Sequence, residues 1–295
     1  MTTVPETWSI GSVLRWATED FARRGLARPR LEAELLLGHV LGVDRVRLVI
    51  DSDRPLRPDE LGSFREVILR RRRGEPVAYI RGEREFYGRR FVVDRRVLVP
   101  RPETEILVEV ALERTRERSL FGRALDLCTG SGCVAVTFAL ERPTWKITAS
   151  DLSADAIELA AHNAARLGAL FGMRFLVGDL FEPLAADARF ELVTANPPYI
   201  PESEIAGLEP DVRDFEPRLA LDGGEDGLAV VRRIVSGARS RLVPGGVLAL
   251  EVGHDQAARV HALLAEHGYT EIQRRRDYAG YERIVSARAG VSDPA

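Results

Sequence analysis

The strongest constraint on the fold is an alternation of short apolar runs with helical segments that begins near residue 100. Alternating strands and helices predict a parallel sheet with helices on both faces, which is an α/β fold. In such a sheet, ligands bind beyond the carboxyl ends of the strands. We therefore expect the functional residues directly after the apolar runs. The predicted strands are 124–127, 147–149, 175–177, 192–195, 247–252 and 284–286.

The first 75 residues instead predict a small helical domain. Apolar side chains recur at helical spacing over residues 13–21 and 35–41. A third helix opens with Asp59 and Glu60 and ends in the arginine run 70–73, which complements the helix dipole. We expect this run to form a solvated face, although it could also touch an acidic or nucleic-acid partner.

Between these two regions, residues 78–93 have an extended pattern. Tyr79-Ile80, Glu85–Tyr87 and Phe91–Val93 are separated by Gly82 and Gly88, which predicts a β-hairpin connector. The expected domains are therefore an N-terminal helical docking domain at 1–75, the connector at 76–95 and an α/β domain at 96–295.

Charge and cysteine content exclude several classes of protein. The 295 residues include 42 basic and 45 acidic side chains, so there is no overall basic excess for nucleic-acid binding. The two cysteines exclude a disulfide framework and indicate a reducing compartment. Residues 1–10 do not read as a signal peptide, and no apolar stretch approaches the ~20 residues that span a bilayer. We expect a cytoplasmic protein with no membrane partner and no metal.

A glycine-rich turn follows the first predicted strand, in the sequence Asp126–Gly132. Glycines at a strand-to-helix turn let the backbone approach a ligand closely. Asp151 ends the second strand, where a carboxylate can accept hydrogen bonds from both ribose hydroxyls. Asp179 follows the third strand and can accept from the amino group of an adenine. This layout predicts a site for a nucleoside cofactor.

The fourth predicted strand leads directly into Asn196-Pro197-Pro198-Tyr199. Consecutive prolines stiffen the backbone and cannot donate hydrogen bonds, so the carbonyl of Pro197 is a fixed acceptor. The Asn196 side chain offers a second acceptor, and Tyr199 offers an aromatic face for a planar group. Two acceptors match the two N–H groups of an amide or an exocyclic amine. This element predicts methylation of a planar nitrogen, with no metal and no strong general base.

These motifs resemble class I methyltransferases that act on planar nitrogen, and more narrowly the HemK/PrmC-type release factor glutamine methyltransferases. The resemblance covers residues 70–286, and the N-terminal helices match the family's helical domain in size. The segments that carry it are Arg73–Ile80, Leu98–Glu105, Asp126–Gly132, Asn196–Tyr199 and Phe215–Leu228.

The resemblance implies a Rossmann-like, mostly parallel, seven-stranded sheet. It also implies transfer of a methyl group from S-adenosyl-L-methionine to the glutamine N5 in the Gly-Gly-Gln motif of class 1 peptide chain release factors, with S-adenosyl-L-homocysteine as the other product. A monomer without a direct nucleic-acid partner is expected. The implied cofactor-binding residues are Cys128, Thr129, Gly130, Ser131, Gly132, Asp151, Asp179, Leu180 and Asn196. The implied catalytic and substrate-binding residues are Asn196, Pro197, Pro198 and Tyr199, with Arg101 and Glu103 at the entrance.

Several alternatives stay open at this point. A sister enzyme could methylate glutamine in a large-subunit ribosomal protein, and a nucleic-acid methyltransferase could place an adenine amine against the same acceptors after base flipping. A non-enzymatic module could keep the glycine-rich turn for structure alone. Arg101 and Glu103 could form a local ion pair with no substrate role. Glu251 and Asp255 are interpreted as strand-end and helix-cap residues.

Overall fold

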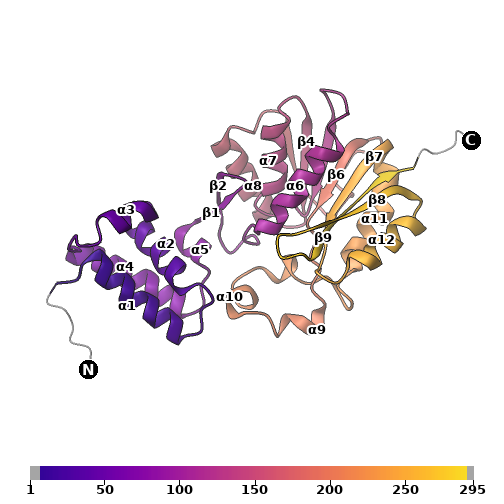
Figure 1. The fold of residues 1–295 in the computed structure, drawn as a ribbon. Coiled ribbons are helices and arrows are strands. Elements are labelled where there is room, and N and C mark those ends of the chain that lie inside the picture. The colour runs from indigo at the N-terminus through magenta and orange to yellow at the C-terminus, as the bar shows by residue number, and fades with distance from the viewer. Residues whose placement is uncertain (1–6, 291–295) are drawn as a thin grey trace, which may run out of the picture. The chain divides into compact units, whose positions relative to one another are not determined.

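The computed structural model describes residues 7–290, and the predicted domains begin and end outside this range, at Met1 and Ala295. The chain forms two compact units (Figure 1). The first contains the chain up to Gly82 together with Pro210–Phe215, and the second contains Glu83–Glu209 and the chain from Glu216 onward. None of the helices between residues 7 and 290 has the length and apolar character that crossing a bilayer requires.

The first unit is helical, as predicted. Its core is apolar and includes Val13, Leu14, Phe21 and Phe64. Ser9 caps the first helix, since its hydroxyl accepts a hydrogen bond from the Ser12 N–H. The helices are α1 (Ile10–Arg23), α2 (Pro29–Leu41), α3 (Arg45–Ile50), α4 (Pro58–Arg72), α5 (Val77–Arg81) and α10 (Pro210–Arg213).

The extended structure predicted at Tyr79-Ile80 is wrong, because Val77–Arg81 forms the helix α5. The Ile80 N–H donates to the Pro76 carbonyl over 3.0 Å, which closes a helical turn. Gly82 ends the helix at φ +72°, a left-handed conformation that glycine adopts without strain. Burial of both Tyr79 and Ile80 favours this turn over a strand that would expose one of them.

The arginine run at the end of α4 is not the solvated face that was expected. Arg71 is only 6% exposed and pairs with Glu32 at 2.6 Å and with Asp211 at 3.5 Å. Arg72 makes two hydrogen bonds to the buried carboxylate of Asp20. These cations therefore hold α4 to other elements of the first unit.

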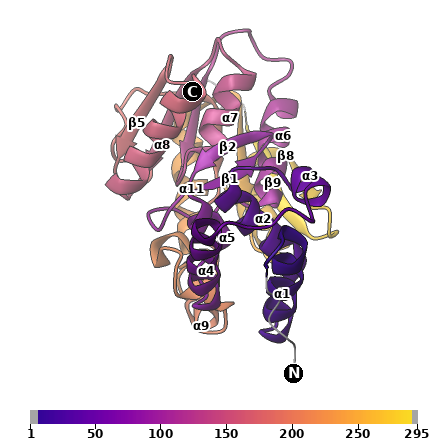
Figure 2. The same cartoon turned by 90° about the vertical axis from the view of Figure 1, so that its left-hand side faces the viewer.

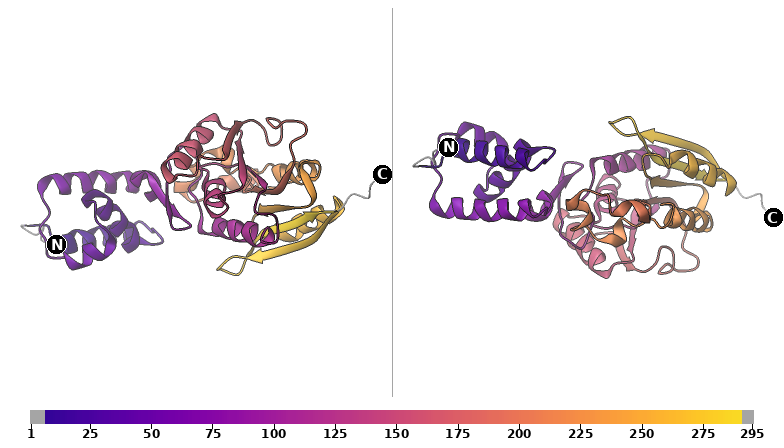
Figure 3. Two further views of the ribbon diagram at one scale, coloured as in Figure 1. Left: turned by 90° about the horizontal axis from the view of Figure 1, so that it is seen from above. Right: turned by 90° about the horizontal axis from the view of Figure 1, so that it is seen from below.

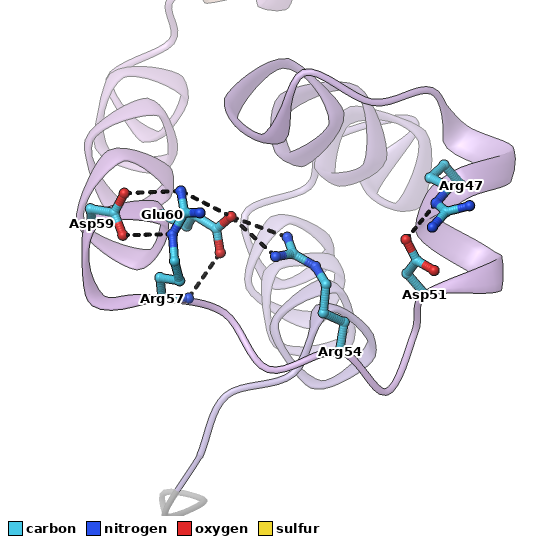
Figure 4. A network of polar contacts seen from close by, with 6 residues as sticks. All are labelled: Arg47, Asp51, Arg54, Arg57, Asp59 and Glu60. Carbon is cyan, nitrogen blue, oxygen red and sulfur yellow. Dashed lines mark hydrogen bonds and ion pairs between the residues drawn. The ribbon is translucent and has the colours of Figure 1, made fainter.

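The start of α4 is fixed by a second polar network (Figure 4). The Glu60 carboxylate accepts from the Arg57 N–H over 2.9 Å and from the Arg54 guanidinium over 3.2 Å. Arg57 also donates two hydrogen bonds to Asp59. A carboxylate in the first turn satisfies an otherwise unpaired N–H and complements the helix dipole, so the acidic opening read from the sequence begins α4.

The second unit opens with a hairpin of β1 (Glu83–Phe86) and β2 (Arg89–Val92), which pair antiparallel. The fully buried side chain of Asn163 anchors it. Its Oδ1 accepts from the Val92 N–H over 2.8 Å, and its Nδ2 donates to the carbonyls of Val92 and Ser131. The same amide therefore ties the hairpin to the glycine-rich turn.

A seven-stranded sheet follows, in the order β5-β4-β3-β6-β7-β9-β8. The strands from β5 to β7 pair parallel, and β9 pairs antiparallel with both neighbours. The predicted mostly parallel α/β sheet is thus confirmed. The strands are β3 (Arg123–Leu127), β4 (Lys146–Asp151), β5 (Met173–Val177), β6 (Phe190–Ala195), β7 (Leu242–Glu251), β8 (Tyr269–Arg276) and β9 (Glu282–Ala289).

Both edges of this sheet are visible in the ribbon views. β8 and β9 form the long yellow hairpin at one edge (Figure 3), and β5 lies beside α8 at the other (Figure 2). The apolar runs in the sequence did not predict β8. Most of its side chains are exposed and many are charged, because it is an edge strand with solvent around it.

Helices cover both faces of the sheet, as a parallel sheet requires. One core includes residues of α6, α7 and α8, and the other includes residues of α11 and α12. The helices of this unit are α6 (Pro102–Arg114), α7 (Cys133–Glu141), α8 (Ala154–Leu167), α9 (Glu202–Ile205), the 3-10 helix η1 (Arg218–Ala220), α11 (Ala229–Arg241) and α12 (Ala257–Glu266).

Candidate active site

A cavity of about 340 Å³ lies at the carboxyl ends of β3, β4, β5 and β6, within the second unit. This volume is in the range of small-molecule and cofactor sites. Most predicted site residues meet here, although the strands that carry them are far apart in the sequence. The predicted residues that line the cavity are Arg101, Cys128, Thr129, Gly130, Ser131, Asp151, Asp179, Leu180, Asn196 and Pro198.

The glycine-rich turn connects β3 to α7. Gly130 and Gly132 have φ values of +52° and +78°, which few other residues adopt without strain. The Thr129 hydroxyl donates to the buried Asp126 carboxylate over 2.6 Å. Gly132 does not line the cavity, and a Cβ there would lie 3.0 Å from the Ala160 Cβ. Its role in this structure is the close packing of α7 against α8.

The cysteines on either side of this turn are free thiols. Loss of solvation raises the pKa of Cys128, and the same effect raises that of Cys133 to about 12. Both side chains therefore stay neutral at physiological pH, as packing residues do. Among residues 7–290, no group of three or more His, Cys, Asp and Glu side chains could hold a metal ion.

Asp151 ends β4 and braces the turn. Its Oδ2 accepts from the Gly130 N–H and its Oδ1 accepts from the Ser153 N–H, both over 2.9 Å. Burial raises the pKa of Asp151, while these backbone donors act in the opposite direction. Each carboxylate oxygen keeps one further lone pair, so the side chain can also accept from hydroxyl groups of a ligand in the cavity.

Asp179 and Leu180 follow β5. The Asp179 carboxylate accepts from Arg233 over 2.7 Å, a partner that the sequence did not indicate. Leu180 is 9% exposed and lines the cavity with an apolar surface, at a positive φ of +50°. The acidic and apolar groups expected after this strand are therefore both at the cavity.

The Asn196-Pro197-Pro198-Tyr199 element leaves the end of β6. Asn196 and Pro198 line the cavity, whereas Pro197 is buried and does not line it. The Asn196 Nδ2 donates to the Thr104 hydroxyl over 3.2 Å. This bond uses the donor end of the amide and leaves its Oδ1 as an acceptor.

Tyr199 is half-buried and does not line the cavity. Its hydroxyl accepts from the Arg283 guanidinium over 2.9 Å, and that guanidinium lies 5.2 Å from the ring centroid. Its carbonyl accepts from Gln256 over 2.8 Å. Burial raises the pKa of Tyr199 to about 12, so the phenol stays neutral. Contacts with Arg283 and Gln256 thus hold the ring and the backbone of Tyr199 in place.

Arg101 lines the cavity, but its partner is not Glu103. The Arg101 guanidinium donates to both oxygens of Glu216, over 2.8 and 2.7 Å, and the Glu216 side chain is 1% exposed. The local ion pair with Glu103 considered from the sequence is therefore wrong. Glu103 is half-buried in the first turn of α6 and does not line the cavity.

Sequence reasoning did not identify Glu251 as a buried carboxyl group near the site. Glu251 ends β7 with 0% exposure, and neither of its carboxylate oxygens has a hydrogen-bond partner among the described residues. Burial raises the pKa of Glu251 to about 7, although the nearby Thr104 hydroxyl and the Arg283 guanidinium favour the charged form. Its position at a strand end was the available signal, but it was interpreted with Asp255 as a polar cap.

Comparison with known proteins shows which class of protein has this fold and these sequence segments. The sequence profile of the PrmC N-terminal domain matches residues 12–82, and that of the methyltransferase small domain matches residues 102–207. A methyltransferase from Pyrococcus furiosus superimposes over 70% of this chain and 91% of its own, with a TM-score of 0.52 and 18% identity. The fold and the site thus define a class I, S-adenosylmethionine-dependent methyltransferase.

Full-length relatives give the family. A release factor glutamine methyltransferase of Geobacter sulfurreducens is 43% identical over 98% of this chain and 100% of its own. Another from Chlorobaculum tepidum is 44% identical over 96% and 98%. A third, from Bordetella pertussis, is 47% identical over 87% and 93%. The chain belongs to the release factor glutamine methyltransferase family, so the resemblance read from its motifs is confirmed.

Proposed function

We propose that this chain transfers a methyl group from S-adenosyl-L-methionine to the side-chain N5 of the glutamine in the Gly-Gly-Gln motif of class 1 peptide chain release factors. One observation carries the proposal. Asn196 and Pro198, at the end of β6, and the glycine-rich turn at the end of β3 line one cavity. Relatives that match nearly the whole chain are release factor glutamine methyltransferases.

The residues of the cavity fit the cofactor. The glycine-rich turn from Cys128 to Gly132 leaves room for a close approach, and Asp151 has lone pairs free for two ribose hydroxyls. Asp179 offers an acceptor for the adenine amino group beside the apolar surface of Leu180. When bound, the cofactor supplies an electrophilic methyl group on a positively charged sulfur.

The Asn196–Tyr199 element holds the glutamine amide. An amide nitrogen is a weak nucleophile, because its lone pair is delocalised. The Asn196 Oδ1 and the Pro197 carbonyl accept its two N–H groups, and Tyr199 supports the amide plane. Orientation of this kind contributes roughly 7–11 kcal/mol to catalysis in well-aligned systems. The same acceptors stabilise the positive charge that develops on nitrogen before its proton leaves.

The remaining assignments extend this proposal. We assign Arg101 and Glu103 to the entrance, where the side chain of Arg101 is held by Glu216. A protein substrate needs a docking surface, and we assign that role to the helical domain of residues 1–75. We propose a monomer that acts in the cytoplasm without binding nucleic acid directly, because its substrate is a protein of the translation machinery.

Labelled methyl transfer tests the function. Purified, unmethylated release factor is incubated with the enzyme and labelled S-adenosyl-L-methionine, beside a release factor whose Gly-Gly-Gln glutamine is replaced. We expect label on the first protein and none on the second, and none from an Asn196→Ala enzyme. Label on a ribosomal protein or a nucleic acid instead would leave a methyltransferase but refute the substrate assignment.

A further inference from the structure

The ring of Tyr199 can support the substrate amide only if its plane is held in one orientation. A planar amide packs well against an aromatic face only when the two planes are aligned. The two prolines before Tyr199 restrict the backbone, but they leave the torsions of its side chain free. The contacts that hold the ring must therefore come from outside the Asn196–Tyr199 element.

Arg283, the second residue of β9, makes two contacts with this ring. Its Nη2 donates to the Tyr199 hydroxyl over 2.9 Å, and its Cζ lies over the ring, 5.2 Å from the centroid. A planar guanidinium that binds the hydroxyl and also covers the ring restricts both the position and the tilt of the ring. The hydrogen bond from Gln256 to the Tyr199 carbonyl, in contrast, acts on the backbone alone.

Arg283 is itself held in place but is poorly compensated for its burial. Its carbonyl accepts from the Val252 N–H over 2.9 Å, which ties the residue to the end of β7. Its side chain is 15% exposed and lies 3.9 Å from the Glu251 carboxyl group, and its Nε has no hydrogen-bond partner among the described residues. A guanidinium at this depth loses hydration that these neighbours replace only in part. The stability of the fold alone therefore does not account for its position.

We propose that Arg283 is a positioning residue for methyl transfer, which holds the Tyr199 ring in the plane that the substrate amide requires. This inference rests on the proposed function, since it concerns the same amide. Arg283 does not line the cavity, so it acts through Tyr199 and not on the substrate itself. Its loss should slow methyl transfer and leave the binding of the cofactor intact.

The test measures single-turnover methylation of release factor by Arg283→Met and Arg283→Lys enzymes. Methionine keeps part of the apolar stem and removes every donor, whereas lysine keeps a positive charge and a donor. We expect the rate constant at saturating release factor to fall about 10- to 100-fold for Arg283→Met, and to fall less for Arg283→Lys. Affinity for S-adenosyl-L-methionine, measured by calorimetry, should change little in both. A wild-type rate from Arg283→Met would refute the proposal.

Arg288→Met is the matched control, because Arg288 lies on the same strand and is 23% exposed. Its guanidinium donates to the Glu271 carboxylate and to the carbonyls of Gly245 and Arg114, and none of these residues lines the cavity. We expect the wild-type rate from this variant. An equal loss in Arg288→Met and Arg283→Met would show that removal of any half-buried arginine from β9 slows the enzyme, and would overturn the proposal.

Tyr199→Phe tests the hydrogen bond from its other end. Phenylalanine keeps the ring and lacks the hydroxyl, so only the weaker contact of Arg283 with the ring remains to be lost. Arg283→Met should then lower the rate by no more than about fivefold relative to Tyr199→Phe alone, a coupling that independent structural losses would not produce. The same loss in both backgrounds, or a wild-type rate from Tyr199→Phe, would refute the proposal. Absence of glutamine methylation by the wild type would refute the proposed function and this role with it.

Discussion

Replacing Asp151 by asparagine should weaken the binding of the cofactor. The carboxylate accepts two backbone hydrogen bonds of 2.9 Å, from Gly130 and Ser153. An asparagine can accept at one end only, so its NH2 group must face one of these two N–H donors. A hydrogen bond to a charged group contributes about 1.5–3 kcal/mol, and one such bond is lost.

This loss falls on the glycine-rich turn that lines the cavity. We expect the dissociation constant for S-adenosyl-L-methionine to rise about 10- to 100-fold, which calorimetry can measure directly. Asp155→Asn is the matched control, because Asp155 is an exposed residue of the first turn of α8 that does not line the cavity. An Asp151→Asn enzyme that binds the cofactor as tightly as the control would refute the bracing role.

Three further changes test the fold around the site. Arg71→Met should lower the free energy of unfolding by about 2–4 kcal/mol in urea titrations, because it leaves Glu32 without its 2.6 Å partner, whereas the exposed Arg65→Met should not. Gly132→Ala should cost about 1–3 kcal/mol by the same measurement, since φ is +78° and the new Cβ would crowd α8. The free energy of unfolding of the wild type, relative to that of Glu251→Gln, should fall by about 2–3 kcal/mol as pH rises from 4.5 to about 7, because the folded wild type holds a proton on Glu251 that the unfolded chain releases.

The surroundings of Glu251 set the size of that pH effect. Its carboxyl group faces Thr104 of α6 and Arg283 of β9, with Arg101 and Glu103 as more distant charges. The cations favour the charged form and Glu103 disfavours it, while burial dominates. A wild-type stability that rises relative to Glu251→Gln across this pH window would contradict the sign of the argument.

The parts of this protein that the sequence predicted are those whose chemistry is local. Asp151 follows its strand directly, and Asn196 to Tyr199 follow theirs, so a rule about strand ends was enough to bring them together. The parallel strands β3, β4 and β6 were readable because most of their residues are buried and include apolar runs. β8 has neither property, since it is an exposed edge strand with a charged sequence.

The errors have a common physical origin in contacts between distant residues. Glu216 holds Arg101 from 115 positions away, and Glu32 holds Arg71 from 39 positions away. Nothing in the local sequence indicates either partner. α5 was misread for a related reason, because the burial of Tyr79 and Ile80 in a helical core decides between a turn and a strand.

The same division explains how the site is built. The residues that line the cavity come mostly from loops after single strands, but the groups that hydrogen-bond to Asn196 and Tyr199 come from other elements: Thr104 from α6 and Arg283 from β9. A catalytic loop that contains two prolines has a stiff backbone, yet its side chains still need fixed orientations. The buried network behind Asn196 and Tyr199 provides them. Substitutions in this network should therefore reduce kcat while leaving cofactor affinity intact. Substitutions at Asp151 should instead reduce cofactor affinity while leaving kcat intact.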